Sequence, residues 1–390
     1  MESYLLRTLG NTLTIEGQRP ALTVISGMPG VGKTVLAQSA FSDLAYVDLA
    51  EVSASSLARA SAADFFSVYG ARLVIDSADA VEGLIEALPE TPDAEIVLVG
   101  NFSGRNRELL AARGARFLTL MPLCLAESRG RNPRPFALEP VPVRISYPEA
   151  GFFESLRVGF MPRSAQSVFS GTYYEKWLSA FFAQTLSLKY RVAKLPEFLA
   201  FMRALARTNA SEINHYALAR QARCSYRTAI YWAEYLLAEG VLLEIPSLVV
   251  GVRRQIRRPK TVFADTGLLC YLLGIADTHA LIGSPSYQGI VEGFAASEII
   301  KSYRAWGKDA PLFYYRDTSF KNVPFVVKTP YGYVPLLFLT KRARDPAIAL
   351  REAKVLSRIG LATAPAVFFT DGSVTRATTE HALFSLSEIG

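Results

Sequence analysis

The first third of the chain carries short, nearly continuous apolar runs that are separated by stretches with helical periodicity. The runs lie at residues 21–25, 44–50, 72–76, 95–101 and 115–123. Apolar runs spaced by helices in this way are typical of a parallel sheet that is buried on both faces. The pattern therefore predicts an α/β fold in which helices cover both faces of a parallel sheet.

The middle of the chain has the pattern of three helices followed by a hairpin. One helix is expected over 198–208, a second up to about Ala222 and a third up to about Glu239. Asn214 and Ser225 can cap the second and third helices, because their side-chain oxygens accept from backbone N–H groups. The apolar residues of the third helix fall on one face, at Ala229, Trp232, Ala233, Leu236 and Leu237. Helix–turn–helix plus hairpin is the winged-helix plan.

The last third is predicted to be a second region of helices and strands. Helices are expected within 260–275 and 289–303, and strands within 312–342 and 367–373. A stretch rich in Pro and Arg at 127–151 interrupts the periodic pattern and indicates a linker or an insertion.

The strongest chemical signal is Gly27-x-x-x-x-Gly32-Lys33-Thr34, which follows the first apolar run and opens a helical stretch. Strand, glycine-rich loop and helix in this order form a P-loop, whose backbone N–H groups and helix N-terminus bind phosphates. Lys33 is expected to reach the β- and γ-phosphates, and the Thr34 hydroxyl to bind Mg²⁺. The sequence predicts binding of ATP with Mg²⁺ through Gly27, Gly30, Val31, Gly32, Lys33, Thr34, Val35 and Asn101.

Two polar residues follow neighbouring apolar runs, beside the expected phosphate site. Asp76 ends the run at 72–76, where it can hold Mg²⁺ through water. Asn101 ends the run at 95–101. It either contacts the γ-phosphate or the attacking water, or it only begins a turn, and the sequence leaves both alternatives open.

These motifs resemble those of AAA-type ATPases. More closely, they resemble a bacterial and archaeal family in which such an ATPase precedes a winged helix and a C-terminal domain of unknown function. The family has a Glu after Asp76, which would activate water as a general base, whereas this chain has Ser77. Loss of such a base costs about 10²–10⁴ in rate. The resemblance therefore implies ATP binding with weak or absent hydrolysis, unless Asp79 or an acid of a neighbouring subunit substitutes.

The expected winged helix offers candidate contacts to DNA. Arg227 and Tyr231 lie on the exposed side of its third helix, and a basic run at 253–260 would lie on or after the hairpin. Lys and Arg side chains in such places neutralise phosphates. The alternative is that the winged helix packs on the ATPase domain and the basic run is solvated. The candidate residues are Arg227, Tyr231, Arg253, Arg254, Arg257 and Arg258.

In related proteins the last third is similar to a restriction-endonuclease-like fold, in which carboxylates bind Mg²⁺ beside a Lys. At the matching positions this chain keeps Glu292 and Lys341, but Pro324 and Leu339 replace two carboxylates. The resemblance implies a degenerate nuclease-like α/β domain without its acidic site. The expected organisation is a P-loop AAA-like nucleotide-binding domain at 1–126, a linker at 127–165, a helical and winged-helix domain at 166–259 and a nuclease-like domain at 260–390.

Composition adds limits on location and partners. The chain has 390 residues, a formal net charge of +7 and a pI near 9.2, which permits an acidic partner such as DNA but does not require one. Three cysteines lie far apart, as expected in a reducing cytosol. No signal peptide is expected at the N-terminus, and no apolar run reaches the roughly 18 residues of a membrane helix.

We therefore expect a cytoplasmic, ATP-binding switch or scaffold whose partner is DNA or a protein. Two alternatives remain open at this point: an active ATPase that uses a non-standard acid, and a DNA-binding regulator whose nucleotide is structural. The sequence does not fix the oligomeric state or the nucleobase, because a P-loop contacts phosphates.

Overall fold

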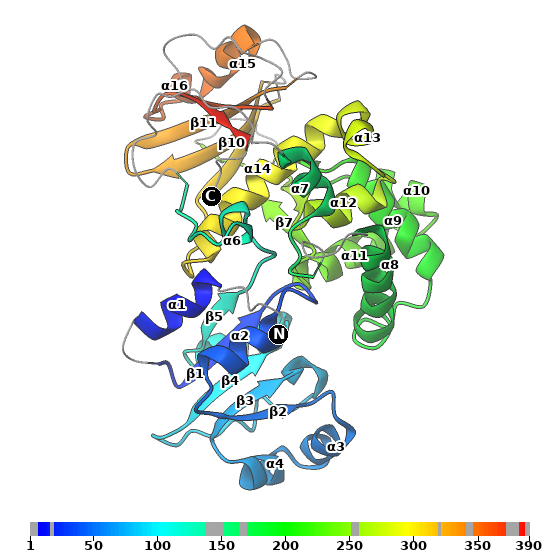
Figure 1. Cartoon of the computed structure of the whole chain (residues 1–390), viewed down its shortest axis with the longest axis vertical. Coiled ribbons are helices and arrows are strands. Elements are labelled where there is room, and N and C mark those ends of the chain that lie inside the picture. The colour runs from blue at the N-terminus through cyan, green and yellow to red at the C-terminus, as the bar shows by residue number, and fades with distance from the viewer. Residues whose placement is uncertain are drawn as a thin grey trace.

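The computed structural model describes residues 7–15, 19–136, 151–163, 170–250, 257–318, 321–340, 346–371 and 382–386. Figure 1 shows three regions that follow one another along the chain. A parallel sheet with its helices lies at one end (blue and cyan), a mostly helical region lies to one side (green), and a second sheet lies at the other end (orange and red).

The first region is a five-stranded parallel sheet in the order β2-β3-β4-β1-β5. Its strands fall within the five expected apolar runs, give or take one residue: β1 Leu22–Ser26, β2 Ala45–Asp48, β3 Arg72–Asp76, β4 Glu95–Val99 and β5 Arg116–Thr119. The flanking helices are α1 Thr8–Ile15, α2 Lys33–Ala40, α3 Val52–Ala60, α4 Ala62–Tyr69 and α5 Gly104–Ala112. The predicted α/β class with a P-loop NTPase sheet is confirmed.

Both faces of this sheet are covered. Leu73 and Ile75 of β3 pack in one apolar cluster and Val74 packs in another, because successive side chains of a strand point to opposite faces. The cluster that holds Val74 continues into the helical region and the second sheet. The parallel sheet is therefore packed against the rest of the protein.

The middle region contains three consecutive helices, α9 Leu195–Arg207, α10 His215–Ala222 and α11 Tyr226–Ala238. As expected, Asn214 and Ser225 cap α10 and α11 by accepting from backbone N–H groups at 3.2 and 3.0 Å. An antiparallel sheet in the order β6-β8-β7 completes this part, with β6 Ser211–Glu212, β7 Leu242–Ile245 and β8 Lys260–Phe263. We call α9–α11 with β6–β8 the three-helix unit. That it is a winged helix stays a prediction.

One expected boundary falls inside this unit. The limit between residues 259 and 260 lies directly before β8, which is the central strand of the small sheet and pairs with both β6 and β7. The three-helix unit therefore extends at least to Phe263 and includes the start of the segment that we assigned to the C-terminal domain. The other boundaries stay predictions.

The buried carboxylate of Asp265 joins several helices of the middle region. It accepts hydrogen bonds from the Leu268 N–H at 2.8 Å, the Phe160 N–H at 2.7 Å and the Tyr174 hydroxyl at 2.6 Å. A buried carboxylate is stable only when donors surround it, so these bonds fix the relative positions of the helices. The helices here are α7 Phe152–Val158, α8 Ser170–Ala180 with a π-helical continuation Phe181–Leu186, α12 Thr266–Leu272 and α13 Thr278–Gly283.

The C-terminal region is a mixed sheet in the order β13-β12-β11-β10-β9, in which β9 to β11 are antiparallel and β11 to β13 are parallel. Its elements are α14 Tyr287–Arg304, β9 Leu312–Arg316, β10 Asn322–Thr329, β11 Gly332–Leu339, α15 Pro346–Ala353, α16 Val355–Arg358, β12 Val367–Thr370 and β13 Ala382–Ser385. In the parts of the chain described above, no helix is both long enough and apolar enough to cross a membrane.

A buried ion pair joins this region to the first one. Glu298 and Lys301 of α14 lie 2.8 Å apart and are almost fully buried. The Glu298 carboxylate accepts from the Leu125 N–H at 2.7 Å, and Lys301 donates to the Leu123 carbonyl at 3.2 Å. Leu125 begins the short helix α6 Leu125–Ser128, which leaves the first region. The start of α6 is therefore held directly against α14.

Asp265→Ala is expected to destabilise the protein strongly. The change leaves three buried donors without their acceptor, and a loss of about 3 kcal/mol or more in the free energy of unfolding is expected from unpaired buried groups. Asp277→Ala is the matched control, because exposed Asp277 caps α13 through one bond to the Ala280 N–H. Removal of such a cap costs about 1 kcal/mol. Urea denaturation measures both, and equal losses would contradict the role of Asp265.

Candidate nucleotide-binding site

The P-loop connects β1 to α2, and its backbone path depends on glycine. Gly27, Gly30 and Gly32 have φ values of 145°, 84° and 94°, which residues with a side chain rarely adopt. At Gly27 a Cβ atom would also lie 2.1 Å from the carbonyl oxygen of Leu120. The loop can follow this path only because these three residues lack side chains.

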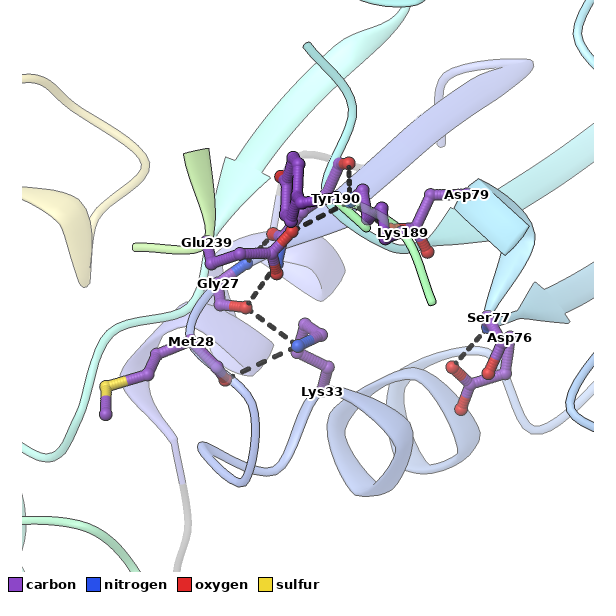
Figure 2. Close-up of polar contacts among 10 residues, drawn as sticks. Gly27, Met28, Lys33, Asp76, Ser77, Asp79, Lys189, Tyr190 and Glu239 are labelled. Atoms are coloured by element: carbon purple, nitrogen blue, oxygen red, sulfur yellow. Dashed lines mark hydrogen bonds and ion pairs between the residues drawn. The ribbon is translucent and has the colours of Figure 1, made fainter. Parts of the chain in front are cut away.

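Lys33 begins α2, and its side chain folds back over the loop. Its ammonium group donates to the carbonyl oxygens of Gly27 at 2.7 Å and Met28 at 3.3 Å (Figure 2). Burial lowers the pKa of Lys33, and the nearby carboxylates, first Glu239 and then Asp79, oppose this shift. Negative charge therefore already lies close to the group that is expected to reach the phosphates.

Thr34 and Asp76 meet where α2 begins and β3 ends. The Thr34 hydroxyl donates to Asp76 Oδ2 at 2.5 Å, and the Tyr46 hydroxyl donates to the same oxygen at 3.0 Å. Mg²⁺ prefers oxygen ligands and usually combines one or two carboxylates with phosphate oxygens and water. The pair fits the predicted Mg²⁺ site. Among the described residues, no group of three or more acidic, His or Cys side chains could hold a metal, so phosphate oxygens would have to contribute.

Ser77 is, through its hydroxyl, a hydrogen-bond donor in this structure and not a base. Its φ is 54°, in the left-handed region, and its hydroxyl donates to Asp48 Oδ1 at 2.9 Å. Its N–H donates to Asp76 Oδ1 at 2.7 Å. A hydroxyl that donates to a carboxylate cannot serve as a proton acceptor of useful strength at neutral pH. A Glu at this position would be strained and would face the charge of Asp48.

Asn101 serves as a connector in the structure. Its side-chain oxygen accepts from the Gly27 N–H at 2.8 Å, and its Nδ2 donates to the Gly27 carbonyl at 3.0 Å. The same Nδ2 lies 2.6 Å from Glu239 Oε2, beyond the end of α11. Asn101 therefore holds the P-loop and the three-helix unit together, a role that neither sequence-based alternative included.

A cluster of charged residues, Asp79, Lys189 and Glu239, lies beside the P-loop (Figure 2) and bonds to Asn101. Lys189 Nζ lies 2.5 Å from Asp79 Oδ2 and 2.8 Å from Glu239 Oε1, and it donates to the Asn101 carbonyl at 2.7 Å. The Tyr190 hydroxyl donates to Glu239 Oε1 at 2.7 Å. Burial lowers the pKa of Lys189, but the two carboxylates outweigh it and raise the pKa overall. Lys189 is therefore a charged ammonium group between the first region and the three-helix unit.

Two further contacts bring the helical region against the loop. The Trp177 indole N–H, on α8, donates to the Pro29 carbonyl at 2.8 Å. A Cβ added at Gly30 would lie 3.5 Å from the same indole nitrogen, and one added at Gly240 would lie 3.2 Å from the Met28 nitrogen. The P-loop is thus covered by α8 and by Gly240, the second residue after the end of α11.

The other predicted nucleotide-binding residues lie within or beside the loop. Val31 is buried beneath it. The Val35 side chain is 49% exposed on the first turn of α2, so only its backbone can face a phosphate.

The predicted DNA-contacting residues lie away from the P-loop. Arg227 and Tyr231 are exposed on α11, and Arg257 and Arg258 are exposed before β8. The residues at 253 and 254, the other two members of the predicted basic set, lie outside the described residues. Burial lowers the pKa of His215, which begins α10; Glu234 opposes this shift and Arg258 adds to it. Arg258, in the chain before β8, therefore lies near the start of α10.

The expected nuclease-like positions lie in the C-terminal region. Glu292 on α14 accepts from Gln288 Nε2 at 2.7 Å. Pro324 lies in β10, and its carbonyl accepts from the buried Lys260 ammonium group at 3.1 Å. Leu339 is buried at the end of β11. The residue at 341 lies outside the described residues, and the nuclease-like fold stays a prediction.

Sequence analysis missed several polar residues of this site, among them Tyr46, which donates to Asp76. Asp48 ends β2 as Asp76 ends β3, and the two are paired neighbours in the sheet. Its place at the end of an apolar run was a signal that could have revealed it. Lys189, Tyr190 and Glu239 lie in no motif, and only the packing of the helical region brings them to the P-loop.

Comparisons with known families agree with this geometry in the first region. The family described as ATPase family associated with various cellular activities (AAA) matches residues 23–103. The N-terminal region is therefore an AAA ATPase domain, which supports nucleotide binding there. A family described as a domain of unknown function (DUF8612) matches residues 149–279, which include most of the helical region.

Two curated relatives are the uncharacterized proteins Rv2008c of Mycobacterium tuberculosis and Mb2031c of Mycobacterium bovis. Each is 30% identical to this chain over 155 residues, which is 39% of this chain and 33% of the relative. The match thus spans about a third of the length of these curated relatives.

Three solved structures are among those to which this chain has a distant similarity. The Walker-type ATPase paby2304 of Pyrococcus abyssi has 13% identity and a TM-score of 0.41, and the match covers 68% of this chain and 94% of that one. The RuvB Holliday junction branch migration motor of Thermotoga maritima has 18% identity and a TM-score of 0.31, with 61% and 87% covered. ORC1 of Aeropyrum pernix, in complex with DNA, has 13% identity and a TM-score of 0.29, with 70% and 95% covered. With identities and TM-scores this low, the similarity supports no statement about the activity of this chain.

Asp76→Asn is expected to reduce the effect of Mg²⁺ on ATP affinity. The amide keeps the shape of the side chain but lacks the charge that attracts the cation. We expect the gain in affinity on adding Mg²⁺ to shrink at least about tenfold, or about 1.4 kcal/mol. Calorimetric titration of ATP with Mg²⁺ and with a chelator measures this gain. Asp64→Asn, an exposed acid on α4, is the control, and an undiminished gain in Asp76→Asn would contradict the assignment.

Proposed function

We propose that the protein binds ATP with Mg²⁺ at the P-loop, hydrolyses it slowly or not at all, and uses the bound nucleotide to set the position of the three-helix unit. The observation that carries this proposal is that the P-loop itself lies at the contact between parts of the chain. Trp177 donates to Pro29 and Gly240 lies against Met28. A change in the phosphates held by the loop therefore acts directly on these contacts.

The coupling needs only modest energies. Asn101 and Lys189 each bond to groups of the first region and to Glu239, so a shift of any of them changes both sides of the contact. Two arrangements of the three-helix unit that differ by a few kcal/mol are enough for a switch, provided that the nucleotide favours one of them.

Slow hydrolysis follows from the state of the candidate bases. The Ser77 hydroxyl donates a hydrogen bond to Asp48, and Lys189 holds both Asp79 and Glu239 in ion pairs. A general base needs a free lone pair within reach of the attacking water, and its loss costs about 10²–10⁴ in rate. An ATPase in which one of these acids is released by ATP is the alternative function.

The test is single-turnover hydrolysis of labelled ATP together with a measurement of ATP affinity. Lys33→Ala is expected to weaken ATP binding at least about tenfold, because it removes the cation that contacts the phosphates. Lys176→Ala, an exposed residue on α8, is the control with the same charge change and is expected to bind normally. Wild-type protein should bind ATP and turn it over more slowly than about 1 per second, the lower end of typical enzyme rates.

Two results would contradict the proposal. Rapid turnover that disappears in Lys33→Ala would show an ATP-driven machine. Equal ATP affinity of wild type and Lys33→Ala would show that the P-loop is not the nucleotide site.

A second candidate function is DNA binding, which one surface feature favours. Tyr216 and Tyr226 stack with ring centroids 4.1 Å apart on the start of α10 and α11, and both are exposed. Exposed aromatic rings among basic residues are typical of surfaces that contact nucleic acids. The exposed arginines nearest in sequence are Arg220, Arg223 and Arg227.

The double change Arg257→Ala and Arg258→Ala tests this surface. Each lost phosphate contact reduces the slope of log K against log salt by about 0.9 for duplex DNA, so a reduction of about 1.8 is expected. Fluorescence anisotropy of labelled duplex DNA over a range of salt concentrations measures the slope. The double change Arg59→Ala and Arg105→Ala removes exposed arginines of the first region and is the control. Equal slopes in both double variants would argue against DNA contact before β8.

A further inference from the structure

The first residue after α11 places a buried carboxylate beside the P-loop. The side chain of Glu239 is 3% exposed. One of its oxygens accepts from Lys189 at 2.8 Å and from Tyr190 at 2.7 Å, and the other lies 2.6 Å from Asn101 Nδ2. Donors therefore occupy both oxygens, as a buried anion requires.

This carboxylate lies in the neighbourhood that a third phosphate needs. Lys33 is the group expected to reach the γ-phosphate, and Glu239 is the carboxylate with the largest effect on the Lys33 ammonium group. Asn101 and Lys33 bond to the same carbonyl oxygen, that of Gly27, at 3.0 and 2.7 Å. The Asn101 amide that donates to Glu239 therefore also donates directly to the loop that would hold the phosphates.

The surrounding charges add to this argument. The carboxylates of Asp76, Asp79 and Glu239 all act on Lys33, whereas Lys189 is the other cation that does so. The site already holds more negative than positive charge before any nucleotide is considered. Like charges repel strongly where water is excluded, so the Glu239 carboxylate in this place disfavours a third phosphate beside it.

We propose that Glu239 determines which nucleotide this site accepts: its carboxylate stands in for a third phosphate, so that the arrangement with Glu239 on Asn101 and Lys189 prefers a nucleoside diphosphate to a nucleoside triphosphate. This inference rests on the proposed function, because it assumes that nucleotides bind at the P-loop. It adds how that site is regulated: the three-helix unit determines whether a nucleoside diphosphate or a nucleoside triphosphate binds more tightly.

A triphosphate would move more than one side chain. Glu239 is followed by Gly240, which lies against the Met28 backbone of the loop. When the carboxylate leaves, Lys189 and the Asn101 amide each lose one acceptor, and the third phosphate can replace it; Lys189 keeps its ion pair with Asp79. Displacement of Glu239 thus shifts the end of α11 away from the P-loop. A diphosphate ends before this point and leaves the contacts as they are.

The test compares nucleotide affinities in three proteins. Calorimetry with Mg²⁺ measures the dissociation constants of ADP and of a non-hydrolysable ATP analogue for wild type, Glu239→Gln and Glu234→Gln. Glu234 is exposed on the same helix and gives the same change of charge. We expect wild type and Glu234→Gln to bind ADP at least about tenfold more tightly than the analogue. In Glu239→Gln the analogue should bind at least about tenfold more tightly than in wild type, with ADP affinity changed by less than about threefold.

The possible outcomes separate this inference from the proposed function. An affinity ratio that is the same in Glu239→Gln and wild type overturns the role of Glu239, while the switch itself stands. Loss of slow hydrolysis in Glu239→Gln with an unchanged ratio also overturns it, because Glu239 would then act as a base. If neither nucleotide binds to wild type in a manner sensitive to Lys33→Ala, the proposed function fails first.

A measurement on the wild-type protein covers the case in which Glu239→Gln does not fold. Hydrogen–deuterium exchange is followed for residues 234–245 with saturating ADP and with the ATP analogue. The analogue is expected to increase exchange at the end of α11 and in β7, whereas ADP leaves it unchanged or lowers it. Equal protection with both nucleotides overturns the inference.

Discussion

A carboxylate that is buried between two parts of a chain is stable only where donors from both parts converge on it. Glu239 meets this condition through the Asn101 amide, at the end of β4, and through Lys189 and Tyr190, which follow α8 and its π-helical continuation. These bonds fix the end of α11 relative to the sheet that carries the P-loop. These polar bonds add to the apolar cluster that joins the first region to the three-helix unit, and they fix where the end of α11 lies on the P-loop.

Close approach of backbones makes this contact possible. Gly240 follows Glu239 and touches the loop where a Cβ atom would lie 3.2 Å from the Met28 nitrogen. On the other side of the loop, the Trp177 indole N–H donates to the Pro29 carbonyl at 2.8 Å. The glycines of the P-loop let its backbone face the phosphates. The approach of the α11 end depends on a different glycine, Gly240, which lies outside the P-loop.

The parts of the structure that depend on local sequence could be predicted. The five apolar runs became strands of one parallel sheet, and the caps Asn214 and Ser225 start their helices as expected. The charged cluster could not be predicted in the same way. Glu239 is 50 residues from Lys189 and 138 residues from Asn101, and no spacing rule relates them. Their meeting depends on tertiary packing, whereas a P-loop is defined within eight residues.

Two features, Ser77 in place of a general base and the buried carboxylate of Glu239, both fit the proposed nucleotide-controlled switch. In the function that we propose, a switch with Ser77 in place of a general base cannot return quickly to its diphosphate state by hydrolysis. It has to return by exchange of nucleotides, and exchange is useful only when the two arrangements differ in affinity for the two nucleotides. A carboxylate on Asn101 supplies such a difference, because it competes with a third phosphate and leaves a second one undisturbed. In the proposed switch, Ser77 keeps hydrolysis slow and Glu239 distinguishes a diphosphate from a triphosphate, so that nucleotide identity rather than turnover sets the conformation.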